Sequence, residues 1–277
     1  MSIAELLIIG LMADVALMLL VLAVSLRRHD MGWVDVGWAA GVGITVLLFA
    51  LIPGPAPAWR RCAVGGLALI WSTRLALHIL SHRVKNRIED ARYRSLRDRW
   101  GARARWYVPL LFLAEAPLIT LFSIPALIAL RSPLPAPGPW DILGLTVGLL
   151  AIAGESLADR QLEAFRTQPE HRGKTCRAGL WRYSRHPNYF FEWLHWWAYV
   201  LLAIGAPHAW LTLLGPLAMF VFLFRVTGIP HTERQALASR GDDYRRYQSE
   251  TSAFFPWWPR KAAFPLEPAV PAGPSSS

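Results

Sequence analysis

Long apolar stretches constrain the fold of this chain more than any other feature. A helix needs roughly 20 apolar residues to cross the hydrocarbon core of a bilayer, and backbone polar groups inside the bilayer must be satisfied within the segment. The expected spans are, in chain order, 2–26, 31–52, 63–80, 107–130, 141–157, 188–205 and 210–226. The sequence therefore predicts an all-α, polytopic membrane protein with a bundle of seven transmembrane helices.

The basic residues gather in the connections between these stretches. Nine Lys or Arg residues lie in 83–105 and seven in 160–185, within a formal net charge of +10. Positive-inside sorting and contact with anionic lipids account for this distribution, so membrane lipids and no nucleic acid are the expected partners. Seven spans place both connections and the C-terminus on one side, which predicts a cytoplasmic C-terminus and an outside N-terminus.

Composition also divides the chain and limits its chemistry. The segment 1–130 holds the first four spans, 131–260 holds the last three together with the polar residues 230–250, and 261–277 has the composition of a disordered tail. Cys62 and Cys176 are too few for a disulfide framework or a cysteine metal site. We expect no metal, because the histidines form no dense ligand motif of the His-Glu-x-x-His kind.

A dense polar motif precedes the sixth span. It reads Gly-Leu-Trp-Arg-Tyr-Ser-Arg-His-Pro-Asn-Tyr-Phe-Phe-Glu over 179–192. Pro187 suits the first turn of a helix, where its missing N–H costs nothing. Asn188, Glu192 and His195 then share one helix face. Because ionisable groups at membrane depth are costly and usually functional, the motif indicates a pocket for a large, anionic, hydrogen-bonding ligand.

The motif joins two upstream residues in one candidate cofactor set. Arginines match phosphate oxygens, and the Asn and Tyr side chains add hydrogen bonds, so the set suits a dinucleotide or another phosphate- or carboxylate-bearing cofactor. No Gly-x-Gly-x-x-Gly or Walker-type loop is present. The alternative is that the arginines are topology signals and that Asn188 and Glu192 satisfy each other. The set is Asp159, Arg166, Tyr183, Arg185, His186, Asn188, Tyr189 and Glu192.

From about 141 to 259 the sequence resembles bacterial membrane proteins related to steroid 5α-reductases. The resemblance lies in the motif and in the tail Gly-Asp-Asp-Tyr-Arg-Arg-Tyr followed by Thr-Ser-Ala-Phe-Phe-Pro over 241–256. It implies a bacterial inner-membrane protein whose cytoplasmic half encloses NADPH, and which reduces an activated C=C bond in a steroid or another lipid enone. By position, it also implies cofactor contacts for Asn188, Glu192, Asp159 and Arg166. Tyr183 lies within the matched motif 179–192. The resemblance further implies cofactor contacts for Glu233, Arg234 and Tyr244, which lie in the last matched segment.

The candidate catalytic residues lie in the N-terminal half, where the resemblance is weak. Enone reduction needs a group that polarises the carbonyl. Steroid reductases use a Gln–Glu pair in the second span and a Tyr in the third, and both are missing here. Asp35 is a candidate for the glutamate's role, and His78 or Tyr93 for the tyrosine's. Alternatively, Asp35 bonds Arg74 or a tryptophan N–H, and His78 is a satisfied core histidine.

Two other functions stay open at this point. A methyltransferase of the isoprenylcysteine carboxyl type also carries an Arg-His-Pro segment before a membrane helix and would bind S-adenosylmethionine instead of NADPH. Glu192 favours the reductase-like pattern Asn-x-x-x-Glu over that family. A non-catalytic lipid-binding membrane protein with a degenerate pocket is the third possibility, and the missing Gln–Glu pair and Tyr favour it.

Overall fold

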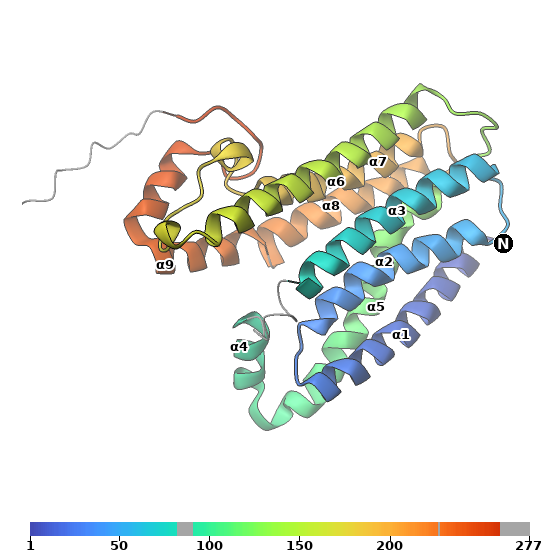
Figure 1. Ribbon diagram of the computed structural model, residues 1–277. Helices are drawn as coiled ribbons and strands as arrows, with labels where there is room; N and C mark the ends of the chain where they lie inside the picture. Colours follow the sequence, from blue (N-terminus) through green and yellow to red (C-terminus); the bar gives the residue numbers. More distant parts are fainter. Residues whose placement is uncertain (82–90, 227, 261–277) are drawn as a thin grey trace, which may run out of the picture. The chain divides into compact units, whose positions relative to one another are not determined.

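The computed structural model describes residues 1–81, 91–226 and 228–260 (Figure 1). The predicted disordered tail 261–277 lies outside the described residues, as do the acidic pair Glu89 and Asp90. Regular structure in the described residues is helical throughout, with no strand. This confirms the all-α prediction.

Nine α-helices and several single turns make up the described chain. The α-helices are α1 Ile3–Arg28, α2 Trp33–Leu51, α3 Ala58–Ile79, α4 Ala91–Trp100, α5 Ala104–Ala129, α6 Pro139–Arg166, α7 Pro187–Leu202, α8 Leu214–Val221 and α9 Ile229–Glu250. The 3₁₀ turns are η2 Gly101–Arg103, η3 Pro169–His171, η4 Gly179–Arg182 and η5 Ala209–Leu213, and η6 Phe222–Val226 is a π turn. Each of the seven predicted apolar stretches falls on helical structure.

Six helical stretches of the described residues are long and apolar enough to cross a membrane. They are Ile3–Arg28, Trp33–Leu51, Ala58–Ile79, Tyr93–Ala129, Pro139–Arg166 and Ala209–Glu250. The remaining predicted span corresponds to α7, whose 16 residues are fewer than a perpendicular crossing needs. The chain is therefore a multi-pass membrane protein by its helices, while the seventh span and the orientation of the termini stay predictions.

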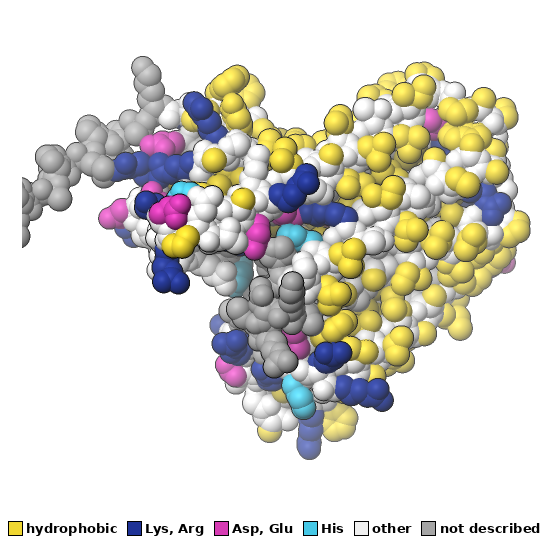
Figure 2. Space-filling view, in the orientation of Figure 1, with side chains coloured by type: hydrophobic (Ala, Val, Ile, Leu, Met, Phe, Trp, Pro, Cys, Tyr) yellow, Lys and Arg dark blue, Asp and Glu magenta, His cyan; other side chains and the backbone are white. Residues whose placement is uncertain are grey.

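The first of two compact units, unit 1, comprises Met1–Ile152 and Trp193–Val221. Its helices α1, α2, α3 and α5 pack along one another, with α2 against α3 and α1 against both α2 and α5 (Figure 1). Large side chains fill the centre, among them Met18, Trp71, Phe112 and Trp196, all buried. Hydrophobic side chains also cover much of the visible outer face of these helices, as lipid contact requires (Figure 2).

Buried polar side chains tie the helices of unit 1 together. Asp14 on α1 accepts hydrogen bonds from Thr45 Oγ1 on α2 (2.5 Å) and from Thr120 Oγ1 on α5 (2.7 Å). Arg60 on α3 pairs with Asp141 on α6 at 2.6 Å and donates to the Leu202 carbonyl at 2.7 Å. Each charge is thus met by a partner on another helix, because polar groups left alone at membrane depth are costly.

The second unit, unit 2, comprises Ala153–Glu192 and Phe222–Ser277. Its described core is aromatic: Ala236, Tyr244 and Tyr247 of α9 are buried together. The Tyr247 hydroxyl donates to the carbonyls of Trp181 and Ser184, which fastens α9 to the polar motif. The polar residues 230–250 lie in α9, and Arg, Asp and Glu side chains gather over this helix (Figure 2).

Candidate functional site

The first half of the polar motif is held in place by backbone contacts within unit 2. Gly179 adopts a φ of +59°, and a Cβ there would lie 2.4 Å from the Gln161 side chain, so both the conformation and the space call for glycine. Gln161 Oε1 accepts a hydrogen bond from the Leu180 N–H at 2.9 Å. The Trp181 indole N–H donates to the Ala158 carbonyl at 2.9 Å. These contacts fix the motif to α6.

The second half of the motif begins α7, as the sequence predicts. Pro187 is the first helical residue. Asn188 Nδ2 donates to Asp159 Oδ1 on α6 at 3.1 Å, while Asn188 Oδ1 accepts from the Tyr189 N–H. One turn further on, Glu192 is buried. Two predicted cofactor residues distant in sequence, Asp159 and Asn188, are thereby brought together.

Arg185, His186 and Glu233 form a polar network between the motif and α9. Arg185 Nε lies 2.7 Å from Glu233 Oε1, and its Nη1 donates to the Gln248 and Thr251 carbonyls. Burial lowers the pKa of His186, so the imidazole is neutral and its Nε2–H donates to Glu233 Oε1 at 3.3 Å. The guanidinium of Arg185 is therefore occupied by the protein, and the network positions α9.

The tyrosines of the predicted site have different surroundings. Tyr189 stacks on the His186 ring at 5.3 Å, and its hydroxyl lies 3.2 Å from Thr232 Oγ1. Tyr183 meets Trp258 edge to face, and its carbonyl accepts from the Trp257 N–H. Tyr244 is buried in the aromatic core of unit 2. Tyr189 and Tyr244 thus both adjoin the polar network, because Glu233 is also a side-chain hydrogen-bond partner of Tyr244.

A second basic cluster of unit 2 surrounds Cys176. Burial raises the pKa of the Cys176 thiol, whereas a backbone hydrogen bond to Ala178 and the positive charges of Arg166 and Arg240 lower it. Both guanidinium groups therefore act on the same thiol, and among the described residues neither has a salt bridge to a carboxylate. The carboxylates of Glu163 and Asp159 also act on the Arg166 guanidinium and partly balance its charge. Sequence reasoning identified Arg166 and missed Arg240, which directly precedes Gly241.

Arg234, the remaining predicted residue of unit 2, is exposed on the first turns of α9. Its Nε donates to the Pro230 carbonyl at 3.2 Å.

Two of the three candidate catalytic residues meet in unit 1. The Tyr93 hydroxyl on α4 donates to Asp35 Oδ1, in the first turn of α2, at 2.5 Å. Tyr93 is buried, with 7% of its surface exposed. A phenol paired with a carboxylate can hold or release one proton between two oxygens. His78, the third candidate, lies half-buried in the last turn of α3.

His195 belongs to the aromatic core of unit 1. Its ring stacks on Trp71 with the planes 9° apart, and its Nε2 lies 3.2 Å from the Tyr199 hydroxyl. The helix face that starts at Asn188 thus continues into hydrophobic packing. Within the described part of the chain, no three His, Cys, Asp or Glu side chains group as metal ligands would.

Comparison with known proteins places the chain in a family. An uncharacterised protein of Schizosaccharomyces pombe is 28% identical over 233 residues, which cover 71% of this chain and 63% of that protein. The chain thus spans less than two thirds of this relative's length. No solved structure matches the chain. A family described as "Protein of unknown function (DUF1295)" matches residues 21–251. Because this match extends over more than half of the sequence, the protein belongs to the DUF1295 family.

Proposed function

We propose that this protein is a membrane-embedded, NADPH-dependent reductase of an activated C=C bond in a steroid or another lipid enone. The hydrogen-bonded pair of Asp35 and Tyr93 carries the proposal. This chain lacks the Gln–Glu pair and the Tyr of steroid reductases, and the Asp35–Tyr93 pair can polarise the substrate carbonyl in their place. The resemblance of the motif 179–192 to the motif of steroid 5α-reductase-like membrane proteins supports it.

The acid pair has a defined task in this chemistry. Asp35 accepts the hydrogen bond of the Tyr93 phenol and so holds this O–H in place, and the phenol can turn the same O–H to the carbonyl oxygen of the enone. This hydrogen bond draws electrons from the conjugated system and makes the β-carbon electron-poor. The same donor stabilises the negative charge that develops on the oxygen as the double bond is reduced.

The donors of unit 2 fit a phosphate-bearing dinucleotide. NADPH supplies the hydride when it is bound. Among the described residues neither Arg166 nor Arg240 has a carboxylate salt bridge, and we propose that these two guanidinium groups bind a phosphate group. The Asn188 amide is oriented by Asp159 and can bind an amide or hydroxyl of the ligand. Arg185, His186 and Glu233 hold the motif 179–192 against α9. The remaining residues of the proposed cofactor set are Tyr183, Tyr189, Glu192, Arg234 and Tyr244.

The proposal divides the protein by task. Residues 1–130 would form the lipid half, entered laterally near Asp35, and 131–260 the cofactor half. The cofactor site would then lie on the cytoplasmic face of a bacterial inner membrane, the side that the positive-inside pattern favours for the basic connections, with α7 as the seventh span. The lipid acceptor would reach Asp35 from within the bilayer.

Enone-dependent oxidation of NADPH tests this function. Detergent-purified protein is incubated with NADPH and a panel of steroid and isoprenoid enones, and loss of the nicotinamide absorbance is followed. We expect turnover with at least one enone, and its loss in Tyr93→Phe. Transfer of a methyl group from S-adenosylmethionine in place of NADPH oxidation would replace the reductase with a carboxyl methyltransferase. Binding of lipid without either reaction would indicate a non-catalytic protein.

A further inference from the structure

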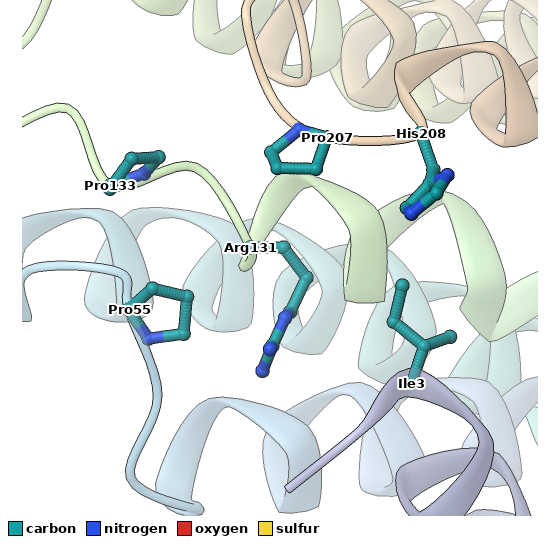
Figure 3. Close-up of a pocket in the computed structure, with 6 residues that line it drawn as sticks. All are labelled: Ile3, Pro55, Arg131, Pro133, Pro207 and His208. Atoms are coloured by element: carbon teal, nitrogen blue, oxygen red, sulfur yellow. The ribbon is translucent and has the colours of Figure 1, made fainter.

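A pocket of about 530 Å³ opens at one end of unit 1, away from the residues discussed so far (Figure 3). Four separate segments line it: the start of α1, the α2–α3 link, the α5–α6 link and the link between α7 and η5. The lining residues are Ile3, Pro55, Arg131, Pro133, Pro207 and His208. Its size is within the range of small-molecule sites in proteins.

The chemistry of the lining is amphiphilic. Two side chains, Arg131 and His208, bring hydrogen-bond donors, three prolines and Ile3 bring apolar surface, and the six lining residues include no carboxylate. Arg131 extends into the space between the links, and His208 faces it from the opposite link (Figure 3). Such a lining suits a ligand that carries an anionic group beside an apolar body.

Neighbouring arginines at this end already have protein partners, whereas Arg131 does not. Arg60 is paired with Asp141, and Arg61 donates to the Ala50 and Leu51 carbonyls. In the parts of the chain that the structure describes, the Arg131 guanidinium has neither a salt bridge nor a side-chain hydrogen bond. The planar guanidinium group of Arg131 is therefore available to a ligand, and the spacing of its N–H donors matches the oxygens of a phosphate.

Exposed tryptophans place the pocket at the level of the lipid headgroups. Trp140 begins α6 and is 50% exposed, and Trp210 begins η5 and is 68% exposed. Tryptophans with this exposure at helix ends mark the membrane–water interface. Exposed Leu143, further along α6, and exposed Leu217, on α8 directly after η5, continue into the hydrocarbon layer. A ligand in the pocket thus has its polar end among headgroups and its apolar end beside acyl chains.

We infer that this pocket binds the phosphate of an anionic phospholipid, with Arg131 as the main ligand-binding residue and His208 as a second donor. The prolines and Ile3 contact the glycerol and upper acyl region of the lipid. This site is independent of the proposed reductase activity, since it shares no residue with either candidate set. Its occupancy by a bilayer lipid would hold the four links of unit 1 together.

The test measures binding of short-chain phosphatidylglycerol to the full chain in detergent, by a ligand-dependent shift in thermal stability. Arg131→Gln is expected to weaken binding about tenfold, because two charge-assisted hydrogen bonds are lost. His208→Gln should weaken it less. Arg28→Gln, at an exposed arginine in the last turn of α1, is the matched control and should bind like the wild type.

The outcomes separate the possible ligands. Phosphatidylcholine binding as tightly as phosphatidylglycerol, or unchanged affinity in Arg131→Gln, would overturn the proposal. Inorganic phosphate is tested in the same way. If it binds with equal affinity and the same dependence on Arg131, the site binds a free anion and the phospholipid proposal is overturned. If Arg131→Gln does not fold, unchanged affinity in His208→Gln overturns it instead. Stabilisation by NADPH should be the same in all three variants, which separates this test from that of the reductase.

Discussion

The buried ion pairs of the two units differ in their exposure and in the number of their partners. In unit 1, Arg60 and Asp141 are 1% and 4% exposed and form an ion pair between α3 and α6. In unit 2, Arg185 and Glu233 are 12% and 16% exposed and belong to a network with His186 and Gln248. The first pair is sealed between helices of unit 1, and water reaches part of the second pair. The Arg60–Asp141 pair of unit 1 therefore serves packing between two helices, whereas the Arg185–Glu233 pair of unit 2 belongs to a wider polar network.

Removing Arg60 should produce the largest effect on stability. Arg60→Met leaves the Asp141 carboxylate buried without its partner, which costs about 3–5 kcal/mol when a buried pair is broken. Chemical unfolding in detergent, followed by tryptophan fluorescence, measures the loss. The double variant Arg60→Met with Asp141→Leu should recover much of it, because no charge is then left unpaired. A single variant as stable as the wild type would contradict the sealed pair.

Removing the acid of the catalytic pair should slow the reaction without unfolding the protein. Asp35→Asn keeps the size of the side chain and is expected to lower kcat on the order of 10²-fold, typical for loss of a proton-donating group. The affinity for NADPH should change little. Steady-state kinetics measures kcat, and a separate binding titration measures the affinity for NADPH. Asp141→Asn is unsuitable as a control, because Asp141 is needed for packing. Equal kcat in Asp35→Asn would remove Asp35 from the mechanism.

Removing Arg185 should cost less than removing Arg60, because water reaches part of the network. Arg185→Met is expected to destabilise unit 2 by about 2 kcal/mol, the range for a hydrogen bond to a charged group. Limited proteolysis in α9, together with thermal unfolding, reports the loosened contact. Arg245→Met, whose pair with Asp242 is largely exposed, is the control and should behave like the wild type. A larger loss in Arg245→Met than in Arg185→Met would reverse the ranking.

Truncating Asn188 should produce the smallest free-energy change of the four. Asn188→Ala is expected to weaken NADPH binding about tenfold, equivalent to the loss of one or two hydrogen bonds to the ligand. Glu192→Ala should act in the same direction, and neither should unfold the helical bundle. Isothermal titration measures the affinity, with circular dichroism as the check on folding. Unchanged affinity in both variants would remove these residues from the cofactor site.

Local patterns predicted the helices better than their contacts. The start of α7 at Pro187 follows from the chemistry of proline at a helix start, and the tail helix from its composition. The third span was predicted from residue 63, but α3 begins at Ala58 and takes Arg60 inside. Hydropathy alone excludes an arginine from a predicted span, so the prediction started after Arg60. The burial of Arg60 depends on its ion pair with Asp141, which lies far along the chain.

The same limit applies to the candidate sites. Asp35 and Tyr93 were proposed for their location, and their hydrogen bond spans 58 residues of sequence. Arg240 was missed because nothing in its local sequence shows that it faces the same thiol as Arg166. Position in a motif identified Asn188 and Glu192, whereas side chains brought together by packing of distant segments required the three-dimensional structure.

A thermal-shift titration of the detergent-purified protein with NADPH, NADH and S-adenosylmethionine tests the central claim most directly. A ligand that binds only the folded state raises the apparent stability by mass action. We predict that NADPH stabilises the protein selectively, that NADH does so weakly, and that Asn188→Ala reduces the NADPH shift. A shift with S-adenosylmethionine alone would contradict the reductase and favour the methyltransferase.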